Sequence, residues 1–201
     1  MNFILDEAYH IYNRGNNKQP IFFNDENYLF FIAKMRAQLK PCCDILCWCL
    51  IPNHFHFILH ANEASVKERS AFGGKPIQEL SYRIGILLSS YSQAINKQNK
   101  TSGSLFQQKT KSKELTTERR KSNRGDYLLN AMHYGHQNPW KAGLVKKIED
   151  WPYSSFLDYS GLRNGTLCNK SLLMDLTGYD LDNFYSDSYK VIEDFDEKDF
   201  L

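Results

Sequence analysis

The sequence lacks the features of a membrane or secreted protein. Its 201 residues contain no apolar run long enough to cross a bilayer. The first ten residues carry Asp6 and Glu7, where a secretory signal would have positive charge followed by a longer apolar stretch. We therefore expect a cytoplasmic protein without a membrane partner.

Internal repeats and low-complexity tracts are also absent, which argues against solenoid and fibrous architectures. A chain of 201 residues with 42% hydrophobic residues can bury one sizeable core but hardly two. We expect one domain over residues 1–179. The acidic segment 180–201 is expected to be peripheral or partly disordered.

No Cys-x-x-Cys pair, a common spacing in zinc and redox sites, occurs among the five cysteines. Four of them crowd into residues 42–49, a stretch typical of a buried strand: Cys42, Cys43, Cys47 and Cys49. Cysteine packed as a small hydrophobic side chain is the favoured interpretation. A zinc or redox site is the alternative.

The net charge of +2 hides an uneven distribution. Residues 180–201 hold eight acidic residues and two lysines, which leaves 23 basic and 15 acidic residues in residues 1–179. Between residues 97 and 124, nine lysines and arginines stand against two glutamates. This local surplus suits a phosphate backbone, although a solvated loop would give the same count.

The hydrophobic patterns predict strands over residues 9–14, 43–50 and 54–60, and an extended basic segment over residues 105–115. Helices are expected from Asn24, as the cap, to Pro41, and over residues 77–96 and 127–138, the last closed by Pro139. Residues 62–75 are expected to form a polar loop. This order predicts an α+β fold, a ferredoxin-like split βαβ sandwich with helices packed on an antiparallel sheet.

His54 and His56 alternate with phenylalanines in a predicted strand. Alternate residues of a strand point to the same face, with Cα atoms about 7 Å apart, so the two imidazoles can share one metal ion. The pair supplies two ligands and does not complete a site. Two half-exposed structural histidines would show the same spacing.

Tyr134 and Asn138 stand four residues apart on the last predicted helix, and therefore on one helical face. One could act as a nucleophile while the other binds the metal. A core tyrosine is the alternative for Tyr134, and Tyr91 on the preceding helix is its nearest rival. Asn138 could equally cap the end of the helix.

Four ordered blocks of the sequence resemble the REP-associated tyrosine transposases, relatives of the insertion-sequence transposases that carry a His-hydrophobe-His motif. The blocks are YHIYNRGNN at residues 9–17, WCLIPNHFH at 48–56, SGSLFQ at 102–107 and YGHQNPWKAGLV at 134–145. The resemblance extends over roughly residues 8–160 and includes DWPYSS at residues 150–155. Ser104 departs from the family pattern, in which histidine is expected between the glycine and the leucine.

The resemblance implies a single-tyrosine transposase domain that nicks and joins DNA. His54 and His56 would bind Mg²⁺ or Mn²⁺, and Tyr134 would form a 5′-phosphotyrosine. Asn138, as the third ligand, stands where the insertion-sequence relatives often have glutamine. The partner would be single-stranded or hairpin DNA, and the protein a monomer or a homodimer.

The basic residues expected to contact DNA are Arg14, Lys109, Lys111, Lys113, Arg119, Arg120 and Arg124, with Phe106 or Tyr127 available for base stacking. Two other functions stay open. A non-catalytic DNA-binding domesticated relative would need neither Tyr134 nor the histidines. A small metal-dependent hydrolase would use the histidines and ignore the tyrosine.

Overall fold

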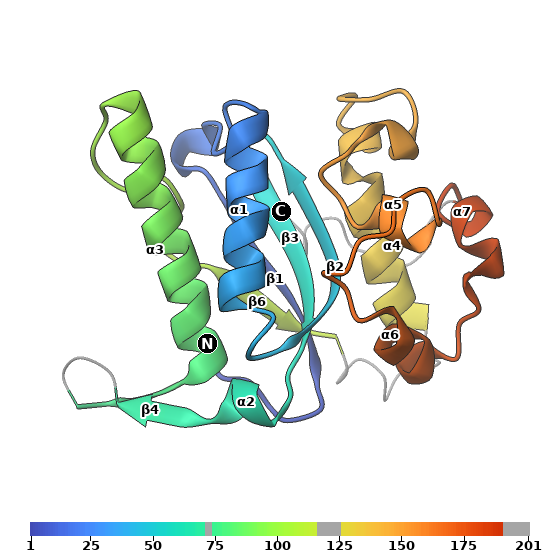
Figure 1. The fold of residues 1–201 in the computed structure, drawn as a ribbon, viewed down its shortest axis with the longest axis horizontal. Coiled ribbons are helices and arrows are strands. Elements are labelled where there is room, and N and C mark those ends of the chain that lie inside the picture. The colour runs from blue at the N-terminus through green and yellow to red at the C-terminus, as the bar shows by residue number, and fades with distance from the viewer. Residues whose placement is uncertain (71–73, 116–125, 191–201) are drawn as a thin grey trace.

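The computed structural model describes residues 1–70, 74–115 and 126–190, and its centre is a four-stranded antiparallel sheet (Figure 1). The strands are β1 (Ala8–Arg14), β2 (Asp44–Ile51), β3 (His54–His60) and β6 (Lys111–Glu114), in the order β2-β3-β1-β6. A helix follows β1 and another follows β3, so each helix connects two strands that are separated by one other strand. This is the split βαβ arrangement, and the predicted α+β fold is confirmed.

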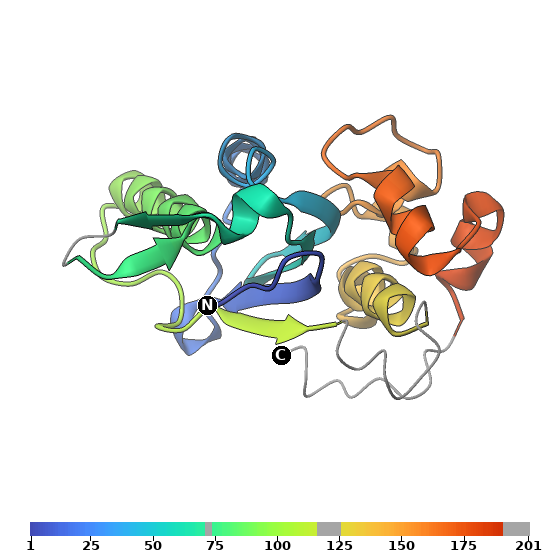
Figure 2. The same ribbon diagram turned by 90° about the horizontal axis from the view of Figure 1, so that it is seen from below.

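Two helices, α1 (Asp25–Gln38) and α3 (Glu79–Asn99), cover one face of the sheet, and Figures 1 and 2 show them side by side. Asn24 caps α1 as predicted, because its side chain accepts a hydrogen bond from the backbone N–H of Asn27 at 3.0 Å. Phe55 and Phe57 of β3 point into this layer and pack against Phe31 of α1. The largest core cluster therefore lies between the sheet and these two helices.

The opposite face of the sheet is covered in part by α4 (Asp126–Lys141). Leu46 and Cys47 of β2 and Ile58 of β3 form a second cluster with Leu128 and Met132 of α4. Short helices complete this layer: η3 (Ile148–Asp150), α5 (Phe156–Tyr159), α6 (Lys170–Thr177), η4 (Leu181–Asn183) and α7 (Phe184–Asp187). The sheet is thus enclosed between two layers, and its second face carries the histidines.

The prediction that Pro139 closes the last helix is wrong, because α4 continues to Lys141. Proline lacks one N–H group and disturbs the turn before it, but it has a helical φ and leaves the following residues able to continue. The backbone N–H of Ala142 still donates to the carbonyl oxygen of Asn138 at 2.9 Å. The chain leaves the helix at Gly143, where φ is +70°.

The polar segment expected to be a loop contains regular structure. It forms α2 (Glu63–Val66) and β4 (Glu68–Ser70), and β4 pairs with β5 (Pro76–Gln78) in a separate two-stranded sheet. Asn62 caps α2 by accepting hydrogen bonds from Ala64 and Ser65. Strands of three residues are too short to show a clear period in the sequence. A 3₁₀ turn, η1 (Asn16–Lys18), follows β1.

The first half of the acidic segment packs against α4. Phe184 is fully buried, and Nε2 of Gln137 donates to the carbonyl oxygens of Ser188 and Lys190 at 2.9 and 3.0 Å. Residues 191–201 lie outside the described residues. Within the described part of the chain, no helix combines the length and the hydropathy needed to span a bilayer.

Candidate metal and nucleic-acid site

The two histidines of the motif project from the α4 face of β3, because Phe55 and Phe57 occupy the α1 and α3 face. Their ring centroids lie 4.8 Å apart, with the ring planes nearly perpendicular at 86°. His56 is buried, whereas His54 at the start of the strand is partly exposed. One divalent ion at the open end of this face can therefore reach both rings.

His54 presents the tautomer that a metal ligand needs. Its Nδ1 lies 2.7 Å from Oδ1 of Asn53, and an amide oxygen can only accept, so Nδ1 carries the proton. The lone pair is then on Nε2, which is buried and makes no hydrogen bond of standard geometry with any described residue. A histidine whose second nitrogen donates to an oxygen while the first keeps its lone pair is the usual arrangement at metal sites.

Both imidazoles are held in the neutral form. Burial, followed by the positive charge of Arg14, lowers the pKa of His54 to about 4, although a contact with the Asn138 amide opposes this shift. Burial also holds the pKa of His56 well below its usual value, with smaller contributions from His54 and His10. Neutral imidazole is the metal-binding form, so both side chains are in the protonation state that a metal requires at neutral pH.

α4 brings Asn138 to the same place. Its amide lies close enough to His54 to interact with the ring, and its Nδ2 donates to the backbone carbonyl oxygen of Tyr134 at 3.0 Å. The amide nitrogen only donates, so Oδ1 is the amide atom that offers lone pairs to a hard cation. Because α4 continues to Lys141, Asn138 lies inside the helix and the helix-cap alternative is wrong.

Among the described residues, no three His, Cys, Asp or Glu side chains gather into a possible metal site. No further histidine, cysteine or carboxylate in the described part of the chain therefore joins His54 and His56 there. The four clustered cysteines are all buried, as packed hydrophobic side chains would be. His54 and His56 offer two imidazole nitrogens, and Asn138 is the neighbouring residue that would add an amide oxygen to a divalent ion. An ion held by these three groups would keep coordination positions for phosphate oxygens.

Tyr134 lies on the second face of the sheet and is 4% exposed. Nζ of Lys141 lies 4.9 Å from the centroid of its ring, two helical turns further along α4. The rival Tyr91 lies in the opposite layer. Its hydroxyl donates to the carbonyl oxygen of Ile21 at 2.7 Å, and it is fully buried. Of the two tyrosines, only Tyr134 shares a face of the sheet with the histidines.

His133 and His136 flank Tyr134 in the sequence, but their side chains make hydrogen bonds to other segments. Nδ1 of His133 lies 2.9 Å from Oγ of Ser188, and Nε2 of His136 lies 2.7 Å from Oγ of Ser155. Burial, the largest cause in each case, lowers the pKa of His133 to about 4 and that of His136 well below its usual value. Both side chains tie α4 to neighbouring segments and hold it on the sheet.

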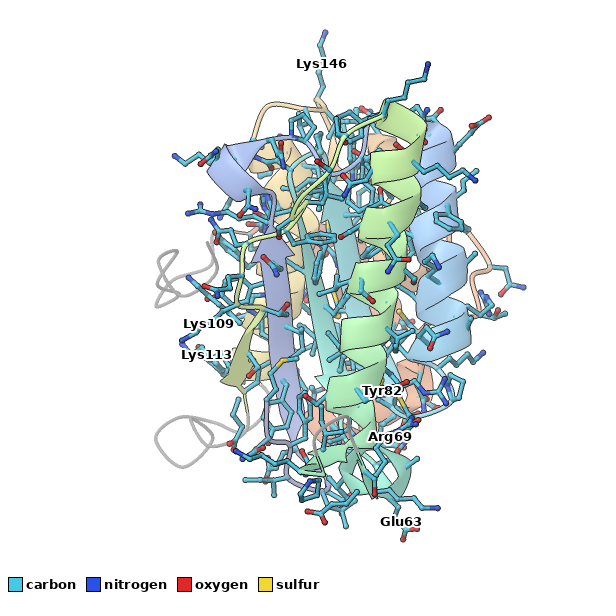
Figure 3. The ribbon with its side chains drawn as sticks, turned by 90° about the vertical axis from the view of Figure 1, so that its left-hand side faces the viewer. Glu63, Arg69, Tyr82, Lys109, Lys113 and Lys146 are labelled. Atoms are coloured by element: carbon cyan, nitrogen blue, oxygen red, sulfur yellow. The ribbon has the colours of Figure 1, made fainter. Side chains whose placement is uncertain are left out.

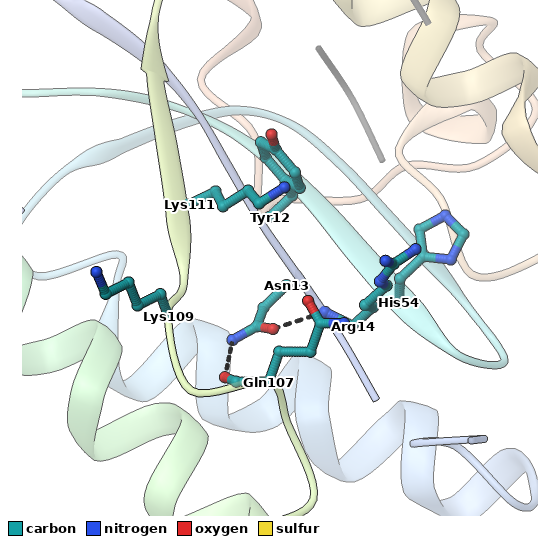
Figure 4. A pocket seen from close by; sticks show the side chains of 7 residues that line it. All are labelled: Tyr12, Asn13, Arg14, His54, Gln107, Lys109 and Lys111. Atoms are coloured by element: carbon teal, nitrogen blue, oxygen red, sulfur yellow. Dashed lines mark hydrogen bonds between the residues drawn. The ribbon is translucent and has the colours of Figure 1, made fainter. Parts of the chain in front are cut away.

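A basic pocket adjoins His54, and Figure 4 shows its lining residues. Arg14 at the end of β1 lines it together with Lys109 and Lys111, which precede and begin β6. Asn13 fixes this loop, because its Nδ2 donates to the carbonyl oxygen of Gln107 at 3.1 Å and to Oγ1 of Thr110 at 3.0 Å. Three of the basic residues predicted to contact DNA thus line one pocket with His54.

The other predicted basic residues are placed differently. Lys113 lies further along β6, with Nζ 5.5 Å from the Tyr127 ring centroid, and Figure 3 shows it on the same side of the molecule as Lys109. Arg119, Arg120 and Arg124 lie outside the described residues. Phe106 is 5% exposed and packs edge-on against Phe55, so the structure contradicts the expectation that it stacks on a base.

Two polar residues of this region have no pattern in the sequence that marks them as functional. His10 of β1 is fully buried, and its Nε2 lies 2.9 Å from Nδ1 of His56. Lys141 places its ammonium group over Tyr134. The spacing of seven residues between Tyr134 and Lys141 predicts a shared helical face, but only if the helix passes through Pro139.

A solved structure of a REP-associated tyrosine transposase bound to a REP hairpin is similar to this chain, with a TM-score of 0.58 and 18% sequence identity. The alignment covers 98% of this chain and 93% of that chain. No family model matches the sequence, and no curated protein matches it either. At this level of identity the similarity establishes a shared fold.

Proposed function

We propose that this protein is a metal-dependent enzyme that nicks and rejoins single-stranded DNA through a covalent bond to Tyr134. The observation that carries the proposal is the packing of α4 on the histidine face of the sheet, where Asn138 approaches His54. This packing supports a site to which β3 contributes the imidazoles and α4 contributes an amide and a phenol. The shared fold with a tyrosine transposase is consistent with it.

His54, His56 and Asn138 would hold the ion. When bound, Mg²⁺ or Mn²⁺ supplies positive charge that polarises the scissile phosphate and favours ionisation of a nearby phenol, whose pKa is otherwise ~10. The neutral imidazoles and the amide add no charge of their own. Arg14 lines the pocket beside His54 and would help to neutralise the phosphate that enters there.

Tyr134 would be the nucleophile of the chemical step. Its oxygen attacks phosphorus, the new Tyr–O–P bond forms, and the bond from phosphorus to the 3′ oxygen breaks. The phenol loses one proton and the departing 3′ oxygen gains one, so the step needs no cofactor that is consumed. The 5′-phosphotyrosine retains the bond energy, and a 3′ hydroxyl of a second strand can reverse the reaction to join DNA. Lys141, over the ring, would stabilise the developing negative charge on the phenol.

The substrate would be a hairpin-forming single strand, because one tyrosine cuts one strand at a time. The similar protein was solved with a hairpin bound, which supports this choice. Lys109 and Lys111 would follow the backbone next to the metal, Lys113 would extend the path along β6, and the remaining arginines, Arg119, Arg120 and Arg124, would add to it.

A covalent-adduct assay tests the proposal. A labelled single-stranded hairpin is incubated with protein and Mn²⁺, and the products are separated on a denaturing gel. We expect a protein–DNA adduct with the wild type and none with Tyr134→Phe or His54→Ala. Tyr127→Phe, which removes a hydroxyl from the same helix, is the matched control and should form the adduct.

The remaining outcomes separate the alternatives. DNA binding without cleavage by the wild type would indicate a binding protein that has lost catalysis. Metal-dependent cleavage that survives Tyr134→Phe would point to water as the nucleophile and would overturn the proposed mechanism.

A further inference from the structure

We propose that His10 is a positioning residue that selects the metal-binding tautomer of His56. This inference rests on the proposed function, because it concerns the same metal. It assigns a role to a buried side chain that the mechanism above does not use. The role is to accept a hydrogen bond from Nδ1 of His56 and so to keep the lone pair of His56 on Nε2.

The geometry is that of a fixed pair. Nε2 of His10 and Nδ1 of His56 are 2.9 Å apart, and the two rings are nearly coplanar, with an interplanar angle of 11°. The register explains the contact, because His10 pairs with Ile58 and Tyr12 pairs with His56 across β1 and β3, which places both rings on one face. Tyr12 stacks on His10 with ring centroids 4.6 Å apart. Neighbouring strands and a stacked ring therefore hold both imidazoles in place.

Only one direction of this hydrogen bond is compatible with metal binding through Nε2 of His56. If His10 donates, His56 carries its proton on Nε2, and that nitrogen has no lone pair for a cation. If His56 donates, the proton is on Nδ1 and Nε2 becomes the ligand. Asn53 does for His54 what His10 does here, since Oδ1 of Asn53 accepts from Nδ1 of His54 at 2.7 Å.

The two ligands are thus oriented by different chemistry. Asn53 fixes one direction, because its oxygen can only accept, whereas an imidazole can donate or accept. His10 is also more enclosed than Asn53, with 0% exposure. We infer that its neutral ring accepts from His56. Both His54 and His56 then keep their lone pairs on Nε2, ready to bind one ion.

Two substitutions of His10 separate positioning from simple packing. In His10→Gln, the end of the side chain stands where Nε2 was and can still accept from His56. In His10→Asn, the amide stands near the position of Nδ1 and falls short. Both variants place an amide in the same buried position, so a purely structural role predicts similar behaviour for the two.

The readout is the affinity for Mn²⁺ alone, measured by electron paramagnetic resonance, together with the imidazole ¹⁵N shifts of His56. We expect the wild type to show the Nδ1–H tautomer, His10→Gln to bind Mn²⁺ within a few fold of the wild type, and His10→Asn to bind about 10- to 100-fold more weakly. His60→Gln and His60→Asn, at a second buried histidine of β3, are the matched controls and should leave the affinity unchanged.

Equal Mn²⁺ affinities for His10→Gln and His10→Asn would overturn the inference, and so would an Nε2–H tautomer of His56 in the wild type. In either case, a DNA adduct formed by the wild type would leave the proposed function intact. Absence of both Mn²⁺ binding and adduct formation in the wild type would overturn the two together.

Discussion

Nδ2 of Asn138 donates a hydrogen bond to the backbone carbonyl oxygen of Tyr134 at 3.0 Å, so the amide and the proposed nucleophile are locked to one turn of α4. The bond helps to hold the side chain of Asn138 in one rotamer. The proposed metal ligand and the proposed nucleophile therefore move together if α4 shifts on the sheet.

Replacing Asn138 with alanine should weaken Mn²⁺ binding by at least about tenfold. Loss of a residue that only hydrogen-bonds to a metal ligand already costs about that much affinity, and loss of a ligand itself should cost no less. Stability should change by only about 1 kcal/mol, because the lost hydrogen bond is a single one and alanine favours a helix. Metal titration and urea unfolding measure the two effects. Asn130→Ala, on the same helix, should leave the affinity unchanged; an equal loss there would point to a general effect on α4.

Lys109 and Lys111 should contribute to the salt dependence of DNA binding. For single strands, the slope of log K against log salt concentration becomes shallower by about 0.7 for each phosphate contact that is removed. Lys109→Ala with Lys111→Ala should therefore reduce the slope by about 1.4 if each lysine neutralises one phosphate. The test is hairpin binding measured across a range of salt concentrations.

The matched control is a double variant that removes two lysines from the other side of the sheet. Lys34 and Lys40, on and just after α1, hydrogen-bond to Ser90 and Thr166, respectively, far from the histidine face. Lys34→Ala with Lys40→Ala should leave the slope near that of the wild type. The same reduction in both double variants would show a nonspecific charge effect and would remove the pocket from the DNA path.

Much of the fold follows from local patterns in the sequence. The alternation of His54 to His60 fixes which side chains of β3 share a face, and the cap at Asn24 fixes where α1 begins. The short ribbon β4–β5 does not follow in the same way, because its three-residue strands are too short to show a period. Its pairing depends on where α2 and α3 place it.

The candidate site was predictable only in part. The helical period places Tyr134 and Asn138 on one face, but nothing local indicates that α4 packs on the histidine face of the sheet. His10 precedes His56 by 46 residues, and their contact depends on the register between β1 and β3. Lys141 was missed because Pro139 indicated a helix end, whereas proline disturbs the turn before it and leaves the residues after it able to stay helical.

His133 should make the protein less stable in mild acid. Its pKa falls from 6.5 to about 4 in the folded state, because burial disfavours the charged ring. The unfolded chain therefore binds the proton more readily between these values, and stability is lost as the pH falls through that window. From pH 7 to pH 5 this group should remove about 2 kcal/mol of unfolding free energy.

Urea unfolding of the wild type and of His133→Gln at pH 7 and pH 5 measures this contribution. The variant should lose stability at pH 7 but show a pH dependence smaller by about 2 kcal/mol. Ser188→Ala removes the hydroxyl that contacts Nδ1 of His133 and keeps the buried ring, so it should retain most of the pH dependence. An identical pH dependence for the wild type and His133→Gln would mean that the folded state accommodates the charged ring.

Gly15 links the fold to the proposed metal site. Its backbone N–H donates to the carbonyl oxygen of Asn53 at 2.8 Å, and Asn53 in turn holds Nδ1 of His54. A Cβ atom on Gly15 would lie only 2.1 Å from the backbone carbonyl oxygen of Gln19, so the turn after β1 has to open before any larger residue fits. Backbone atoms cannot move aside as a flexible side chain can.

Gly15→Ala should therefore lower the unfolding free energy by about 1–3 kcal/mol, the usual cost of inserting a methyl group into a filled space. It should also weaken Mn²⁺ binding, because a displaced turn no longer holds Asn53 against His54. Gly85→Ala in α3 is the control. Apart from the adjoining backbone of α3, no atom of the described residues lies within 4 Å of the new Cβ, and alanine favours a helix, so this variant should gain about 0.5–1 kcal/mol. A Gly15→Ala variant with lowered stability and unchanged metal affinity would show that the turn supports the fold without setting the orientation of His54.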